Sequence, residues 1–189
     1  PSRPDHHHRT RKLSHCHRQL RPAPEPPITG PSADPPSTSG TALPGAGIAS
    51  VDDFGWDPDI AKAWPSDAGL PAVRYAGRLL TAPGGYPAGS GWAPEAAIET
   101  VASPARAAAA VDRQLDAGAS FIKVTLNSDA GPVVDDPTLH AIVGHAHARG
   151  VTVAAHAQGV GQAARAYAVG VDRLAHSPWS ELLGDELLA

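Results

Sequence analysis

From Ser103 onward the sequence alternates helix patterns with short apolar runs, and this alternation limits the fold more than any other feature. Ser103-Pro104 provides an N-cap followed by proline at the first helical position, and Gly118 ends the Ala-rich run that follows. Asp136-Pro137 begins a second helix in the same way, and Gly150 ends it. Because each helix leads directly into an apolar run, we expect β–α–β units on a parallel sheet. The same signals predict a shorter helix from Gly161 to Val169 and a last helix after Ser177-Pro178.

The apolar runs supply the expected strands. Phe121 to Leu126 is the first of this regular part, and two runs that each end on a histidine follow it. Upstream, Ala46 to Val51 and Pro71 to Leu80 are further strand candidates. We therefore expect the α/β class, with residues 42–189 forming about five β/α units of a partial TIM-type barrel. The chain has 189 residues, fewer than the ~250 of a complete eight-unit barrel.

Three side chains stand at or near the C-terminal ends of successive expected strands. Lys123 lies inside the run from Phe121 to Leu126, where a charged side chain is costly unless it has a role. His156 and His176 each close an apolar run and precede a turn. An α/β barrel gathers its catalytic groups at this end of the strands, and neutral imidazole is a common zinc ligand. The sequence thus predicts a divalent-metal site, with zinc as the expected metal, made by Lys123, His156 and His176.

Lys123 leaves two chemistries open. Burial lowers the pKa of a lysine, and the neutral amine can then attack a carbonyl substrate to form a Schiff base. The same neutral amine can take up carbon dioxide and become a carbamate, a carboxylate-like group that bridges two metal ions. Because histidines that could bind metal lie on the neighbouring expected strands, carbamate formation is an alternative to Schiff-base formation.

The other histidines fit a metal site less well. His145 and His147, on the helix from Asp136, are two residues apart and point to nearly opposite sides, so we expect exposed helical histidines. His6-His7-His8 and His15-Cys16-His17 follow no apolar strand. We interpret them as parts of a solvated His-rich tail.

Charge and composition divide the chain near Thr41. Residues 1–41 carry a net charge of +3 and residues 42–189 one of -7, within a formal total of -4. The acidic body lacks the basic face that a nucleic-acid backbone requires, so nucleic acid is not an expected partner. Ten of the 20 prolines lie in the first 44 positions. Residues 1–41 are therefore expected to be a disordered tail.

Composition also bears on where the protein is located and on whether the sequence is a whole gene product. No run approaches the ~20 apolar residues of a membrane span, and the start at Pro1 lacks the apolar core of a signal peptide. Cys16 is the single cysteine, which rules out an internal disulfide. We expect a cytoplasmic protein with a small-molecule or peptide-like substrate and no membrane partner. The chain contains no methionine, which leaves an inactive, truncated gene product as an alternative.

Four segments carry a family resemblance. Phe121–Val124, Ala155–Gly159 and Arg173–His176 resemble strands four, five and six of the amidohydrolase superfamily, in its imidazolonepropionase-like and prolidase-like branch. Gly47–Gly55 resembles the second strand of that branch and its acidic turn. The resemblance covers residues 42–189 and implies a partial (β/α) barrel with roughly strands two to six.

The resemblance also implies roles for the three side chains. Lys123 would be the carboxylated lysine that bridges the metals, and His156 and His176 would bind the second metal, in an enzyme with one or two zinc ions. The implied reaction is hydrolysis of amide, peptide-like or cyclic amide C–N bonds. The family's first-strand His-x-His has no convincing match here, and its final-strand aspartate would lie beyond Ala189. We therefore expect little activity from the chain as given.

Overall fold

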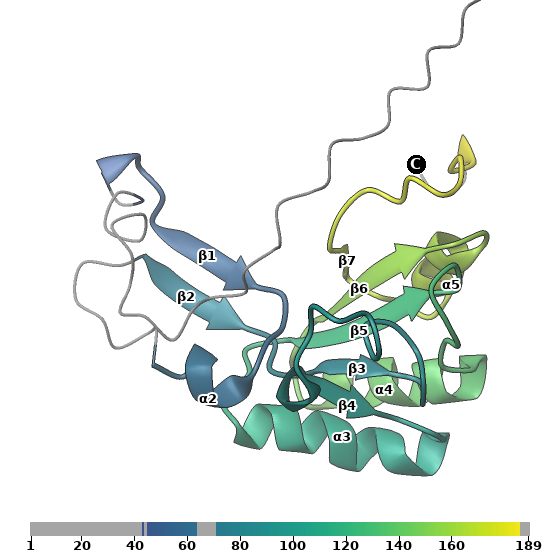
Figure 1. Cartoon of the computed structure of the whole chain (residues 1–189), viewed down its shortest axis with the longest axis horizontal. Coiled ribbons are helices and arrows are strands. Elements are labelled where there is room, and N and C mark those ends of the chain that lie inside the picture. The colour runs from purple at the N-terminus through teal and green to yellow at the C-terminus, as the bar shows by residue number, and fades with distance from the viewer. Residues whose placement is uncertain (1–42, 44, 64–70, 186–189) are drawn as a thin grey trace, which may run out of the picture.

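The computed structural model describes residues 43, 45–63 and 71–185, and all strand pairs in this part are parallel. β1 (Ser50–Asp53) and β2 (Ala72–Tyr75) form a two-stranded sheet. A second sheet has five strands in the order β4-β3-β5-β6-β7 (Figure 1). The predicted α/β class is confirmed, whereas closure into a barrel stays a prediction. The predicted tail, residues 1–41 with its histidines, lies outside the described residues.

The strands of the larger sheet alternate with helices along most of the chain. The strands are β3 (Leu79–Thr81), β4 (Ile98–Thr100), β5 (Ile122–Asn127), β6 (Val153–Gln158) and β7 (Arg173–Leu174). The helices are α2 (Pro58–Ala61), α3 (Pro104–Asp116), α4 (Asp136–Ala148) and α5 (Gln162–Ala168), with a 3-10 turn, η2, at Glu95–Ala97. From β4 to β7 the order is strand, helix, strand without interruption, as the sequence predicts.

The two long helices begin where proline follows a capping residue. Ser103 is the N-cap of α3, and Pro104 is its first residue. The cap of α4 is Asp135, whose carboxylate accepts the Thr138 N–H at 2.8 Å. Both helices cover the same face of the five-stranded sheet (Figure 1). Among the described helices none is both long and apolar enough to cross a membrane.

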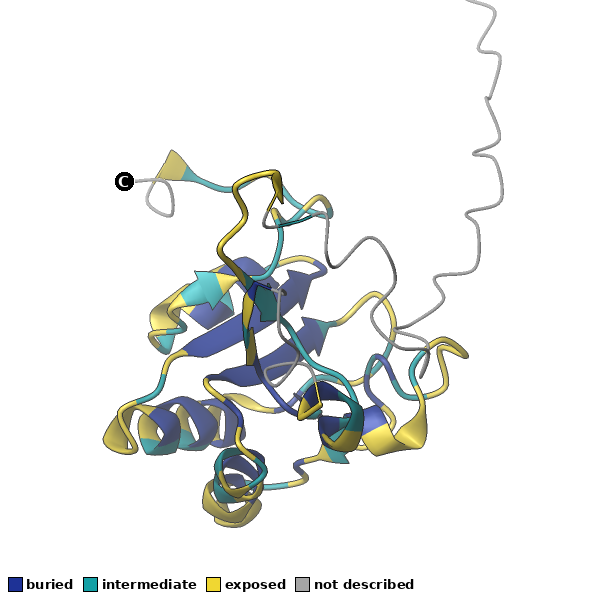
Figure 2. Ribbon diagram, turned by 90° about the vertical axis from the view of Figure 1, so that its left-hand side faces the viewer, coloured by how far each residue is buried: buried dark blue, intermediate teal, exposed yellow. Residues whose placement is uncertain are grey.

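Successive side chains of β5 and β6 point to opposite faces of the sheet. One face packs in the apolar core, and the other, called the site face below, carries Lys123. Ile122, Val124 and Leu126 pack against α3 and α4 in the main apolar cluster. Side chains two positions apart point to the same side of a strand, so Lys123 and Thr125 face away from those helices. Both strands are buried along their length, apart from Asn127 at the end of β5 (Figure 2). Lys123 is therefore buried even though its side chain points away from α3 and α4.

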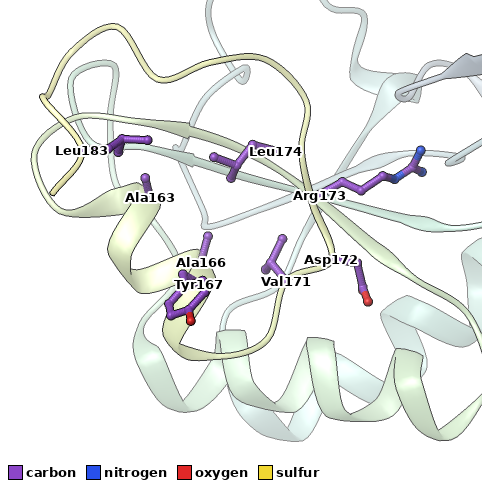
Figure 3. A pocket seen from close by; sticks show the side chains of 8 residues that line it. All are labelled: Ala163, Ala166, Tyr167, Val171, Asp172, Arg173, Leu174 and Leu183. Atoms are coloured by element: carbon purple, nitrogen blue, oxygen red, sulfur yellow. The ribbon is translucent and has the colours of Figure 1, made fainter. Parts of the chain in front are cut away.

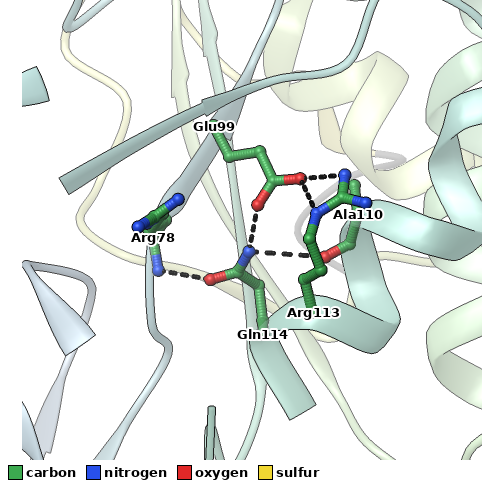
Figure 4. Close-up of polar contacts among 5 residues, drawn as sticks. All are labelled: Arg78, Glu99, Ala110, Arg113 and Gln114. Atoms are coloured by element: carbon green, nitrogen blue, oxygen red, sulfur yellow. Dashed lines mark hydrogen bonds and ion pairs between the residues drawn. The ribbon is translucent and has the colours of Figure 1, made fainter. Parts of the chain in front are cut away.

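The run predicted as one strand from Pro71 to Leu80 is two strands in different sheets. The break is at Gly77, whose φ of 72° is favoured by glycine, and a Cβ there would lie 2.7 Å from Gln114 Oε1. That oxygen accepts the Arg78 N–H at 2.7 Å, while the Gln114 amide nitrogen donates to Glu99 on β4 (Figure 4). A buried glutamine from α3 therefore fixes the turn between β2 and β3, a constraint that the local sequence does not contain.

The helix predicted after Ser177-Pro178 is absent from residues 178–184, so that prediction is wrong for this segment. The chain instead folds back on α5. Glu181 accepts the Gly161 N–H at 2.6 Å and the Ala163 N–H at 3.2 Å, and Ser180 accepts the Gly159 N–H at 2.6 Å. The N-cap of α5 is Gly161, which has no side chain to cap with, so Glu181 satisfies these donors from outside.

Candidate functional site

Lys123, His156 and His176 line one cavity of about 280 Å³. β5 and β6 pair with Thr125 opposite His156, which places Lys123 and His156 on the same face two positions apart. Lys123 is 4% exposed and His156 is 8% exposed. The structure therefore brings together all three side chains that the sequence singles out, while their roles as metal ligands stay a prediction.

The two imidazoles face each other directly. His156 Nδ1 and His176 Nε2 are 2.6 Å apart, and the ring centroids are 4.5 Å apart in an edge-on arrangement. Burial, with smaller contributions from the positive charges of His176 and Lys123, lowers the pKa of His156 to about 4. His156 is consequently neutral at pH 7, the form in which an imidazole binds a metal.

The Lys123 amine is held in surroundings that disfavour its charge. Burial, and to a lesser degree the charge of Arg173, lowers its pKa to about 7. Its Nζ lies 5.0 Å from the centroid of the Phe54 ring. Near neutral pH a large share of Lys123 is therefore the free amine, which is the nucleophilic form.

Asn127 and Gln158 belong to the site, although the sequence analysis did not single them out. Asn127 lies 3.1 Å from His156 Nε2, and Gln158 Nε2 lies 3.2 Å from His176 Nδ1. Asn127 is four positions after Lys123 and Gln158 is two after His156, so strand alternation puts both on the site face. The even spacing of Asn127 from Lys123 and of Gln158 from His156 is the sequence signal that predicts this placement.

Arg173 is a second residue that sequence reasoning missed. It is paired in register with Ala154, and its guanidinium lies 5.3 Å from the Phe54 ring centroid and 4.7 Å from that of Phe121. It donates to Asp52 Oδ2 at 2.6 Å. Arg173 therefore places a positive charge beside Lys123, at the side of the site that is formed by Phe54 and Phe121, which is called the floor of the site below.

Aromatic side chains surround the histidine pair, and Phe54, Tyr86 and Trp92 among them line the cavity. Tyr86 stacks on His156 with centroids 4.8 Å apart, and Trp179 lies over His176 at 5.0 Å. Trp92 stacks on Trp56 at 6.0 Å. The loop that carries Tyr86 is fastened because Thr125 Oγ1 donates to the Tyr86 carbonyl at 2.6 Å. Burial raises the pKa of Tyr86, so its hydroxyl stays protonated at neutral pH.

The donor set fits a divalent metal in part. Among the described residues, no group of three or more His, Cys, Asp and Glu side chains is placed to hold an ion. His156 and His176 supply two nitrogens, and Lys123 would supply oxygen only as a carbamate. His147 is exposed, as expected, and His145 is half-buried; they bond to Asp172 at 2.9 Å and to Asp112 at 3.0 Å, and neither lines the cavity.

A second cavity, of about 180 Å³, lies between α5 and β7 (Figure 3). Its lining is largely apolar, with Ala163, Ala166, Val171, Leu174 and Leu183 among its residues. The Arg173 side chain points away from these residues, toward Asp52 (Figure 3). This cavity gathers no set of catalytic or metal-binding groups, so the candidate site is the cavity around the histidine pair.

No family model matches the chain, and no curated protein matches it either. Solved structures do. An amidohydrolase is 26% identical with a TM-score of 0.62, over 78% of this chain and 41% of its own. A prolidase candidate from Bifidobacterium longum is 26% identical with a TM-score of 0.61, over 79% of this chain and 37% of its own. An Xaa-Pro dipeptidase with methionine bound in its active site shares the fold at 24% identity and a TM-score of 0.63, over 75% of this chain and 40% of its own.

The chain thus spans about two fifths of the length of the structures it matches. Lys123 is the second residue of β5 rather than close to its C-terminal end, His156 lies in β6, and His176 follows β7 by two residues; their order along the chain is the one that the family resemblance requires. The matched fold and this order of residues both support the expected resemblance to the amidohydrolase superfamily and its prolidase-like members.

Proposed function

We propose that the chain carries part of the active site of a metal-dependent hydrolase of amide, peptide-like or cyclic amide C–N bonds. The observation that carries this proposal is the convergence of Lys123, His156 and His176 on one cavity, with facing imidazole nitrogens 2.6 Å apart. The similarity to amidohydrolases supports amide hydrolysis at the level of the superfamily.

The histidine pair would hold the metal, with zinc as the proposed ion and one or two ions in the whole enzyme. His156 would bind through Nδ1 and His176 through Nε2, because these two nitrogens face each other. A divalent ion bound there would lower the pKa of its bound water to about 7, which supplies a hydroxide nucleophile near neutral pH.

Lys123 would complete the site after a covalent change. Its neutral amine adds to carbon dioxide, a C–N bond forms, and one proton leaves, which yields a carbamate anion. A free amine is available because the pKa of Lys123 is about 7. The anion would be attracted by Arg173 and by the metal, whereas the protonated amine is repelled by both.

The cavity would admit a small or peptide-like substrate. Its volume of about 280 Å³ is close to the ~300 Å³ at the lower end of small-molecule sites, and aromatic rings contribute much of its wall. Similarity to a prolidase candidate favours dipeptides as the first substrates to assay. The described residues that line the cavity include no carboxylate that could act as the general base for water.

Metal binding is the direct test. The purified chain, titrated with Zn²⁺ against a chromogenic chelator, should bind zinc at this site, and His156→Asn or His176→Asn should abolish that binding. His145→Asn is the matched control, because His145 pairs with Asp112 away from the cavity. Zinc binding that survives both site substitutions would rule out the pair as ligands.

The chemistry of Lys123 needs a separate experiment. With ¹³C-labelled bicarbonate, a carbamate signal should appear in the ¹³C spectrum and disappear in Lys123→Arg. Reduction by borohydride in the presence of carbonyl substrates should leave the chain unmodified. A reduced adduct on Lys123 would instead support the Schiff-base alternative.

A further inference from the structure

The hydrogen bonds around the histidine pair run in one direction, beginning at Gln158. Gln158 Oε1 accepts the Trp179 N–H at 3.3 Å and the Ser180 hydroxyl at 3.0 Å. Its amide nitrogen therefore faces His176 Nδ1, at 3.2 Å, and an amide nitrogen can only donate. His176 Nδ1 must accept this bond, so the proton of the neutral His176 ring is on Nε2.

The next two bonds follow from the first. His176 Nε2–H points at His156 Nδ1, 2.6 Å away, which must accept. The proton of the neutral His156 ring is then on Nε2, 3.1 Å from the Asn127 amide. Asn127 Oδ1 is buried and has no partner in its present orientation. A 180° turn of that amide lets Oδ1 accept the His156 proton and satisfies both groups.

This arrangement conflicts with a metal bound between the rings. A ring nitrogen that carries a proton cannot bind a metal, and the proton of His176 is on the nitrogen that faces His156. For His176 to bind through Nε2, its proton must move to Nδ1 and find an acceptor there. Gln158 can offer its oxygen only by turning its amide, which takes that oxygen away from Trp179 and Ser180.

We propose that Gln158 is a positioning residue that sets the tautomer of His176, so that metal binding at the histidine pair breaks the bonds that Trp179 and Ser180 make to Gln158, while the Ser180 bond to Gly159 remains. The metal half of this proposal rests on the proposed function. Trp179 is 74% exposed, and its ring lies 5.0 Å from that of His176, so it covers this ring from the solvent side. Glu181 keeps its bonds to Gly161 and Ala163 at the start of α5, so the chain stays attached there when the bonds to Gln158 break.

The tautomer can be measured without any metal. At pH 8 long-range ¹H–¹⁵N correlation shows which ring nitrogen of a neutral histidine carries the proton. His176, assigned by its loss in His176→Asn, should carry the proton on Nε2 in the metal-free chain. In Gln158→Glu the carboxylate accepts at Nδ1, and the proton should move there. A proton on Nδ1 in the unsubstituted chain would overturn the role of Gln158.

Zinc titration tests the coupling. Gln158→Glu should bind Zn²⁺ at least about tenfold more tightly than the unsubstituted chain, the size of effect that partners of metal-binding histidines exert. Ser177→Glu adds the same charge at an exposed position beside His176 and should have a much smaller effect. An equal gain in both variants would show that charge alone is responsible and would contradict the proposal.

Trp179 reports the movement itself. Zinc should change the tryptophan fluorescence of the unsubstituted chain, and Trp179→Phe should lack that change. Zinc binding at the pair with an unchanged Trp179 signal would refute the loss of its bond to Gln158. If neither the unsubstituted chain nor Gln158→Glu binds zinc, the coupling and the proposed function both fail, while the metal-free tautomer still decides the role of Gln158.

Discussion

Arg173 on β7 donates to Asp52 on β1 at 2.6 Å, across 121 residues of sequence, and this pair joins the two sheets on the site side. Asp52 also accepts two bonds from Arg74, at 2.7 and 2.8 Å. The Asp52 side chain is 16% exposed and that of Arg173 is 33% exposed, so water screens the pair only in part. One carboxylate thus holds a guanidinium from each sheet.

Asp52→Asn should lower the free energy of unfolding at pH 7 by about 1–3 kcal/mol, because it removes charge-assisted bonds and leaves Arg173 partly buried without its partner. The bonds from Arg74 and Arg173 lower the pKa of Asp52. A lowered pKa in the folded state means that this stabilisation is full above the unfolded-state pKa of about 3.9 and is lost as the pH falls through the folded value. Urea unfolding at pH 7 and at pH 3 should therefore show the difference shrinking in acid.

Asp59→Asn is the control for this experiment, because Asp59 pairs with Lys62 at the surface, at 3.9 Å. An exposed pair contributes about 0–1 kcal/mol. If the two substitutions cost the same, the Asp52 pair is no more than another surface contact.

Lys123→Met should remove a pH dependence that the unsubstituted chain shows in alkali. The pKa of Lys123 is about 7 in the folded chain because of burial, against about 10.4 for an unfolded lysine. The unfolded state therefore binds more protons between these values, and stability should rise with pH there by up to about 1.4 kcal/mol per unit. Guanidinium unfolding of both chains at pH 7.5, 8.5 and 9.5, in buffers free of carbon dioxide, measures the difference in slope.

Lys62→Met, at an exposed position, is the control and should keep the slope of the unsubstituted chain. Parallel pH dependences for Lys123→Met and the unsubstituted chain would mean that Lys123 is solvated rather than enclosed.

Thr125→Val should loosen the loop that carries Tyr86. The substitution keeps the shape of a 2% exposed side chain but removes the donor to the Tyr86 carbonyl at 2.6 Å. An unsatisfied carbonyl should cost about 1–3 kcal/mol in urea unfolding. Thr100→Val, on an exposed position of β4, should cost much less. Equal costs at the two positions would argue that the loop does not depend on Thr125.

Glu181→Ala should destabilise the first turn of α5. It removes the acceptor of the Gly161 and Ala163 N–H groups, and loss of a cap typically costs about 1 kcal/mol. Amide exchange at these two residues should quicken relative to the middle of β6. Glu95→Ala, at an exposed position of η2, should leave their exchange unchanged. Unaltered exchange in Glu181→Ala would show that other groups cap α5.

Local signals in the sequence were sufficient for much of this structure. The helix starts at Ser103-Pro104 and Asp136-Pro137 depend on residues within one turn, and the strands that carry Lys123 and His156 were recognised from their apolar runs. The failures have non-local causes. Gln114 splits one predicted strand from 36 residues away, and the predicted last helix gives way to contacts of Ser180 and Glu181 with the start of α5. Arg173 was missed because its partner Asp52 lies on another sheet.

The link between β1 and β7 also bears on the order in which the chain assembles. From β5 to β7 each strand pairs with the next one along the chain across a connection that contains one helix, so these contacts close quickly. The Asp52–Arg173 bond closes a loop of 121 residues and gains nothing until both ends are in place. Nucleation should therefore begin around β5 and β6, and the site should acquire its floor only in the final step of folding.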